Sequence, residues 1–153
     1  MGFSFEKLHV YQKSINFADR ICAATEEFPR GYGFLVDQLN RASLSIAANI
    51  AEGNGRFTKP DRKNFFCIAR GSVQECVPLL ELAARRNLLS DETHQELKAQ
   101  LEEIARMLSG LINGLKNRAL DSAAVSAQRR NHWHLIFRNR FRLAKLFQAW
   151  RAL

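Results

Sequence analysis

The sequence has no long apolar run. Although 46% of its 153 residues are hydrophobic, no segment approaches the roughly 18 consecutive apolar residues that a membrane-spanning helix needs. The first residues, MGFSFEKLHVYQK, carry charges where a signal peptide would have its apolar segment. We therefore expect a cytoplasmic protein with no integral membrane association and with one apolar core.

Cysteine is also scarce. The chain has three cysteines, Cys22, Cys67 and Cys76, and their spacing matches no zinc-binding pattern. Each stands beside apolar residues at a position of helical period, so we expect all three to be reduced core residues.

Catalytic patterns are equally thin. None of the four histidines has a carboxylate or cysteine partner at a spacing that would build a catalytic dyad, and the HWH at 132–134 alone is a weak metal signal. These histidines are His9, His94, His132 and His134. With no identifiable nucleophile, the sequence predicts a non-enzyme without a metal or a cofactor.

Nucleotide-binding motifs are missing from the stretch where they would be sought first, NIAEGNGRFTKPDRKNFF at residues 49–66. It matches neither a P-loop nor a Rossmann fingerprint. As a turn between helices it is explained by Gly53 or Gly55 in the left-handed conformation that ends a helix, with Thr58 capping the next helix and Pro60 in its first turn. The four cations of this stretch stay unexplained, because the start of a helix disfavours positive charge. They are Arg56, Lys59, Arg62 and Lys63.

Acidic residues are absent from residues 129–153, which hold seven of the 23 Lys and Arg and leave 16 basic against 15 acidic residues before them. The net charge of +8 therefore belongs mainly to this tail. Its aromatic residues recur at helical spacing opposite the cations, which predicts a basic amphipathic helix after a linker at 119–128. Such a helix suits a membrane surface, an acidic groove or RNA, or it docks on its own or a neighbouring subunit.

Strand patterns are absent as well, and apolar residues recur at helical spacing in four segments before the tail. The repeat lies close to 3.5 residues, which favours helices that wrap around each other with a gentle left-handed twist. We therefore predict an all-α fold. It consists of an antiparallel up-down-up-down four-helix bundle over residues 4–118, with an additional C-terminal basic amphipathic helix within 119–153.

The first helix carries two apolar rows. The row assigned to the core is Leu8, Tyr11, Ile15, Ala18, Cys22 and Thr25. The second row is Val10, Phe17, Ile21 and Phe28. Because one bundle interior does not cover so wide an apolar arc, we expect the second row to contact another subunit. The alternative is that the tail helix covers it within one chain.

Three residues interrupt the helical patterns. Pro78 predicts a bend in the third helix, and Gly71 indicates a close approach between helices in preference to a ligand site. Asn49 lies on the apolar seam of the second helix, where a polar group fixes the register or caps the loop. We interpret Asn49 as structural.

The predicted topology gathers cations at one end of the bundle, where the start of the first helix, the connection between the second and third, and the end of the fourth meet. We call this set the basic pole: Lys7, Arg56, Lys59, Arg62, Lys63, Lys116 and Arg118. A positive surface of this kind binds phosphate backbones through counterion release. The alternative is an ordinary solvated run of charges.

Three stretches resemble one family: FEKLHVYQKSINFA, FPRGYGFLVDQLNRASLSIAANIAEGNGR and FFCIARGSVQECVPLLELA. They resemble the bacterial four-helix-bundle proteins first noted as open reading frames within 23S ribosomal RNA intervening sequences, over about residues 4–118. The fold looks like that of the accessory variability determinant of diversity-generating retroelements, a pentameric barrel with a positive surface that engages RNA and a reverse transcriptase. The resemblance implies a homopentamer without catalytic activity and with a role at RNA or the ribosome. Residues 119–153 depart from the family pattern.

Two functions compete on this basis. The first is a homo-oligomeric bundle that binds RNA through the basic pole as an accessory factor. The alternative is a protein-interaction scaffold that recruits, for example, a reverse transcriptase, with RNA binding incidental. A weaker third hypothesis is a peripheral membrane module that acts through the tail, and failure of the protein to float with anionic liposomes would end it.

Overall fold

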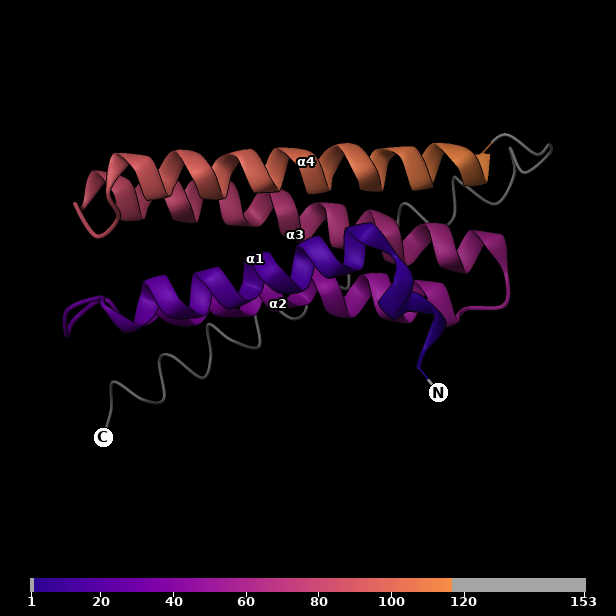
Figure 1. Ribbon diagram of the computed structural model, residues 1–153, viewed down its shortest axis with the longest axis horizontal. Helices are drawn as coiled ribbons and strands as arrows, with labels where there is room; N and C mark the ends of the chain where they lie inside the picture. The colour runs from indigo at the N-terminus through magenta and orange to yellow at the C-terminus, as the bar shows by residue number, and fades with distance from the viewer. Residues whose placement is uncertain (1, 117–153) are drawn as a thin grey trace, which may run out of the picture. The chain divides into compact units, whose positions relative to one another are not determined.

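The computed structural model describes residues 2–116, and every regular element in these residues is helical (Figure 1). A short 3-10 helix, η1 (Ser4–Lys7), comes before four long helices: α1 (His9–Glu26), α2 (Gly33–Gly55), α3 (Lys59–Arg85) and α4 (Asp91–Lys116). The prediction of an all-helical fold with four long helices is confirmed for this part of the chain. The predicted tail helix lies outside the described residues.

The four helices lie side by side around one apolar core. Each helix packs on the next along the chain, and α1 also packs on α4. Figure 1 shows the α1–α2 and α3–α4 connections at one end of the bundle and the α2–α3 connection at the other. This arrangement places η1 and the last turn of α4 toward the same end as the α2–α3 connection.

Two helices begin at side-chain caps, and the first of these, Thr58, is the cap that the sequence predicts. The Oγ1 of Thr58 accepts a hydrogen bond from the backbone N–H of Asp61 at 3.2 Å, and Pro60 stands in the first turn of α3. At the start of α4 the Oγ of Ser90 accepts from the N–H of Thr93 at 3.1 Å. Each cap satisfies a backbone donor that has no partner within its helix, so both helix starts are fixed locally.

The end of α2 differs from the prediction. Among the described residues the only positive-φ glycine is Gly31, so neither Gly53 nor Gly55 is left-handed, and α2 continues through both. Gly53 serves packing instead. A Cβ at this position would lie 2.9 Å from Cε1 of Phe66 and 3.0 Å from Cβ of Phe65. The missing side chain is what lets α2 and α3 approach each other here.

Replacing Gly53 by alanine is expected to lower the free energy of unfolding by about 1–3 kcal/mol, because the added methyl group overpacks the contact with Phe66. Gly71 is the matched control. It is an exposed residue of α3 with open space around a Cβ, so the predicted close approach at Gly71 is wrong and Gly71→Ala should stabilise by up to about 1 kcal/mol. Urea denaturation measures both changes. Equal stability of Gly53→Ala and wild type would contradict the packing role.

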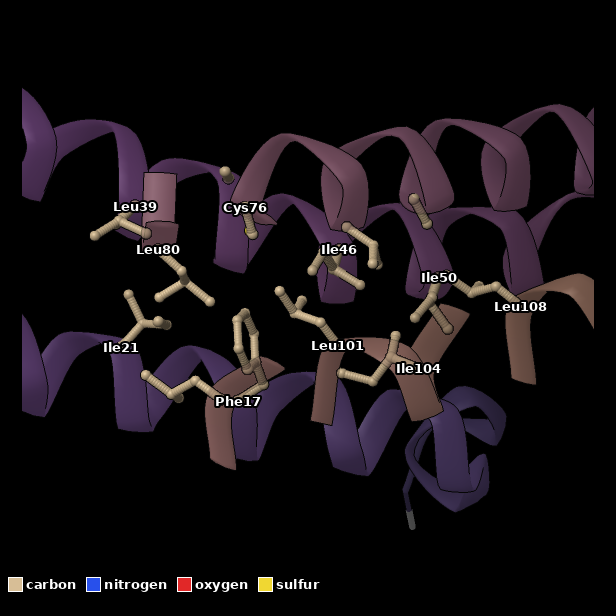
Figure 2. Close-up of a cluster of buried hydrophobic side chains, with 14 of the residues drawn as sticks. Phe17, Ile21, Leu39, Ile46, Ile50, Cys76, Leu80, Leu101, Ile104 and Leu108 are labelled. Atoms are coloured by element: carbon tan, nitrogen blue, oxygen red, sulfur yellow. The ribbon is translucent and has the colours of Figure 1, made fainter. Parts of the chain in front are cut away.

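The core contains side chains from all four helices. Figure 2 shows Phe17 of α1 pointing into the cluster, with Ile21 beside it and Leu80 of α3 and Leu101 of α4 nearby. Cys76 also lies in this cluster, and burial raises the pKa of its thiol to about 12. The other two cysteines are exposed, so the core prediction holds for Cys76 alone.

The second apolar row of α1 is part of this core. Val10, Phe17 and Ile21 are 3%, 0% and 1% exposed. Phe28, the fourth residue assigned to a subunit contact, is partly buried against the same cluster. The row therefore packs inside its own chain, and its assignment to an oligomer interface is corrected. Conversely, Ile15 and Cys22, expected in the core, are exposed.

The buried row of α1 contains a serine whose hydroxyl has a hydrogen-bond partner within the helix, and this is why the row can face the interior. Ser14 lies between Val10 and Phe17 on the buried row, and its hydroxyl donates a 2.7 Å hydrogen bond to the backbone C=O of Val10. A serine whose hydroxyl is paired within its own helix can be buried at little cost. The row with a serine in it is therefore the row that faces the interior.

Polar side chains join α2 to α3 at the edge of the core. Asn49 donates to the C=O of Ser45 at 2.7 Å and to its hydroxyl at 3.1 Å. The Ser45 hydroxyl in turn lies 2.9 Å from that of Ser72, which is buried on α3. This chain of hydrogen bonds gives Asn49 a structural role, and it favours one register between the two helices. Helix α3 continues through Pro78, so that proline does not end it.

Candidate nucleic-acid interface

Cations from three parts of the chain lie toward one end of the bundle. A 2.8 Å hydrogen bond from Asn54 Nδ2 to Ser4 Oγ ties η1 to the end of α2, which brings Lys7 toward the α2–α3 connection. Lys116 is the last residue of α4, whose final turn lies at this end in Figure 1. Arg118 lies outside the described residues. The structure thus gathers the described members of the basic pole.

Arg56 has a local structural role. It follows the last residue of α2, and its guanidinium forms an ion pair with Glu52, one turn earlier. The same guanidinium lies over the ring of Phe65, 4.5 Å from the ring centroid. The pair with Glu52 joins residues four apart in the sequence, the spacing of one helical turn. Part of the Arg56 charge is neutralised, and the contact with Phe65 holds the side chain in place.

Arg62 also stabilises the fold locally. Its Nη2 donates to the backbone C=O of Arg56 at 3.1 Å and, more weakly, to that of Asn54 at 3.4 Å. These carbonyls stand at the end of α2, where carbonyl groups lack partners within the helix and the helix dipole favours a cation. The positive charge of Arg62 is unfavourable at the start of α3 but favourable at the end of α2. Local stability therefore explains two of the four cations that the sequence left unexplained.

Three lysines of the pole, Lys7, Lys59 and Lys63, are charges without such a role. Lys7 and Lys59 are exposed and Lys63 is half-buried. Within residues 2–116, no ion pair involves any of the three. Nearby carboxylates are engaged by other groups: Glu6 accepts from the N–H of Phe3 and Asp61 from the hydroxyl of Thr58. The ammonium groups are available to an external anion.

Two exposed phenylalanines accompany these lysines. Phe57, in the α2–α3 connection, is 103% exposed, and Phe3, beside η1, is 70% exposed. Neither ring was predicted as part of a site, because phenylalanine usually marks a core position. A signal was present in the run from Arg56 to Lys59, where Phe57 stands between cations in a predicted turn.

The opposite end of the bundle has a mixed charge. Arg85 of α3 pairs with Glu81 at 3.1 Å, and this hydrogen bond holds the pKa of the Glu81 carboxyl below its ordinary value. His94 of α4 lies 3.7 Å from the same carboxylate. Glutamates 26, 27 and 92 and Asp91 add further negative charge at this end. Within residues 2–116, this end therefore carries both signs of charge, in contrast to the pole with its three unpaired lysines.

Other classes of site find little support in the described part of the chain. Residues 2–116 contain no group of three His, Cys, Asp or Glu side chains placed to hold a metal ion. His9 and His94 lie on different helices, and the HWH stretch lies outside the described residues. None of the helices within residues 2–116 has the length and apolar character to cross a membrane.

Comparisons with known proteins agree with this architecture. A sequence model described as "23S rRNA-intervening sequence protein" matches residues 6–110. A crystal structure from Bacteroides thetaiotaomicron VPI-5482, of a protein with unknown function from the S23 ribosomal protein family, is similar to the chain with a TM-score of 0.63 and 28% identity. The match covers 67% of this chain and 97% of that one. No curated protein matches the sequence significantly.

Proposed function

Because the chain belongs to the 23S rRNA-intervening sequence protein family, we propose that it is a non-catalytic RNA-binding accessory protein that holds RNA at the basic pole. The observation that carries this proposal is the position of Lys7, Lys59 and Lys63. They lie toward one end of the bundle, and no described carboxylate pairs with them. Free ammonium groups gathered in this way attract phosphates, and their effect on affinity is strong because each contact releases counterions.

The up-down-up-down order of the helices belongs to the same proposal, since it is what brings residues distant in the sequence to one end. Catalysis is not part of it, because holding phosphates requires only placed positive charges. The experiment is a titration of the full chain with structured RNA at several salt concentrations, beside a variant that lacks the three lysines. Affinity that does not depend on salt, or that is the same in both proteins, would contradict the proposal.

We also propose that the protein is a homo-oligomer, with five subunits as the resemblance implies. Since the second apolar row of α1 is buried, the contact between subunits falls to exposed apolar residues of α1 and α2. Ile15 and Cys22 on α1 and Leu44 on α2 are exposed. Hydrogen bonds between Thr25 and Asn40 join the same two helices. An apolar surface on a packed helix pair suits a second copy of the chain.

Leu44→Asp is expected to lower the mass of the particle in light scattering at micromolar concentration, because a charge opposes burial in an apolar contact. Its thermal midpoint as a separated subunit should change little, since Leu44 is exposed. Gln74→Asp introduces the same charge on the exposed face of α3 and should leave the mass unchanged. A Leu44→Asp protein with the mass of wild type would place the contact elsewhere.

The exposed apolar residues also favour a second candidate function, a scaffold that recruits a protein partner while RNA binding is incidental. A relation to the accessory variability determinant belongs to this candidate, and it makes a reverse transcriptase the first partner to examine. Recovery of such a partner with the purified protein after nuclease treatment would support the scaffold. Recovery that depends on RNA would support the first proposal.

A further inference from the structure

The basic pole contains a feature that phosphate binding alone does not need. Two phenylalanine rings, Phe57 and Phe3, are exposed there beside the free lysines. A phenylalanine side chain that stays in water gains none of the stabilisation that burial of its ring would give. Lysines and arginines alone would bind an RNA backbone, so the rings require a separate explanation.

Phe57 is held by fixed neighbours on both sides. The connection between α2 and α3 is short, since α2 ends at Gly55 and α3 begins at Lys59. Arg56 is fixed on the ring of Phe65, and Thr58 is fixed as the N-cap of α3. The backbone of Phe57 is anchored while its ring stands in solvent. Little conformational entropy is therefore lost when a ligand covers the ring.

Phe3 is presented in a similar way. Its N–H donates to the carboxylate of Glu6 at 3.0 Å, and its ring stacks on Phe5 with centroids 5.5 Å apart and an interplanar angle of 13°. Phe5 in turn packs edge-on against Tyr11, with centroids 4.9 Å apart. The hydrogen bond from Asn54 to Ser4 joins this segment to the end of α2 that carries Phe57. Phe3 therefore rests on a fixed support with its ring still largely exposed.

We infer that the basic pole binds unpaired segments of RNA, with bases stacked on Phe57 and Phe3 and phosphates held by Lys7, Lys59 and Lys63. The inference rests on the proposed RNA binding and specifies its substrate class. Bases within a duplex are already stacked on each other and present no free face to an aromatic ring. Unpaired bases have such faces, and surfaces that combine aromatic rings with cations are how proteins hold single strands.

The experiment compares two probes on the full chain: an oligouridine of about twelve nucleotides and an RNA duplex of the same number of phosphates. Phe57→Ala should lower the affinity for the single strand by about 5- to 100-fold, the range of one lost stacking contact. Affinity for the duplex should change by less than about twofold, since phosphate contacts remain. Phe34→Ala is the matched control, because Phe34 is an exposed phenylalanine at the other end of α2.

Two further substitutions separate stacking from simple apolar contact. Phe57→Trp should keep the affinity for the single strand. The fluorescence of the added tryptophan, obtained by subtracting the wild-type emission, should be quenched by oligouridine. Phe57→Leu should behave like Phe57→Ala. Quenching with retained affinity in the tryptophan protein supports stacking, and equal affinity of the leucine protein and wild type overturns it.

The remaining outcomes distinguish this inference from the proposed function. If Phe57→Ala weakens both probes equally or neither, the stacking role is wrong while RNA binding at the lysines stands. If Phe57→Ala lowers the particle mass in light scattering, the ring belongs to a contact between subunits and the inference is also wrong. If replacing the three lysines changes neither probe, the proposed function itself fails, whatever Phe57 does.

Discussion

Replacing Phe17 by alanine is expected to lower the free energy of unfolding by about 3–5 kcal/mol. The ring is 0% exposed and lies within the core cluster, so its removal leaves a cavity among side chains from other helices (Figure 2). The loss is a large part of the roughly 5–15 kcal/mol that stabilises a typical domain. Urea denaturation followed by circular dichroism measures it. Phe34→Ala, which removes an exposed ring at the start of α2, should cost far less.

This result separates a core residue from a subunit contact. A core residue destabilises each chain, so the loss should be the same across a tenfold range of protein concentration. Removal of a subunit contact would instead lower the particle mass, and the loss in free energy of unfolding would shrink as the protein concentration rises. If Phe17→Ala proves too unstable to purify, Phe17→Leu should show the same behaviour with a smaller loss. A wild-type free energy of unfolding for the alanine protein would remove Phe17 from the core.

The helices could be predicted from the sequence because their determinants are local. Leu97, Leu101, Ile104 and Leu108 all face the core, as their spacing requires. The caps at Thr58 and Ser90 likewise depend on residues within one turn. Such features need no knowledge of what packs against the helix.

The orientation of α1 could not be predicted in the same way. Both of its rows are apolar, so the sequence pattern alone does not say which of them faces the interior. The answer depends on where α2 and α4 lie, and on the hydrogen bond that lets Ser14 be buried. The width of the apolar arc showed that one row had to be chosen, and the hydroxyl of Ser14 does not oppose burial because it is paired within its own helix.

The candidate site was likewise predictable only in part from the sequence. Charge clustering in the sequence predicted the basic pole, because the positions of the cations along the chain and the order of the helices are enough to place them toward one end. The separation of its cations into structural and free ones required the structure. Arg62 reaches carbonyls of another helix and Arg56 lies over Phe65, and neither contact follows from spacing alone. The exposure of Phe57 is likewise a property of the folded loop.

Replacing Lys7, Lys59 and Lys63 by glutamine should weaken binding of structured RNA by on the order of 10- to 100-fold at low salt. Each lost phosphate contact should also reduce the slope of log affinity against log salt by about 0.7–0.9, so the variant should be less sensitive to salt by about 2 units. Filter binding or anisotropy at several salt concentrations measures both quantities. Binding should not vanish, because the seven basic residues of 129–153 remain.

The matched control removes three exposed cations toward the opposite end, Arg30, Arg86 and Lys98. It changes the net charge by the same amount, so an equal loss of affinity in both variants would show that total charge binds RNA and that the pole has no special role. The three lysines form no ion pair with a described residue, so their replacement should change stability by less than about 0.5 kcal/mol. Including Arg56 or Arg62 would confound the test, since their contacts hold the end of α2. Loss of affinity with unchanged stability, confined to the pole variant, is therefore the result that only a phosphate-binding surface produces.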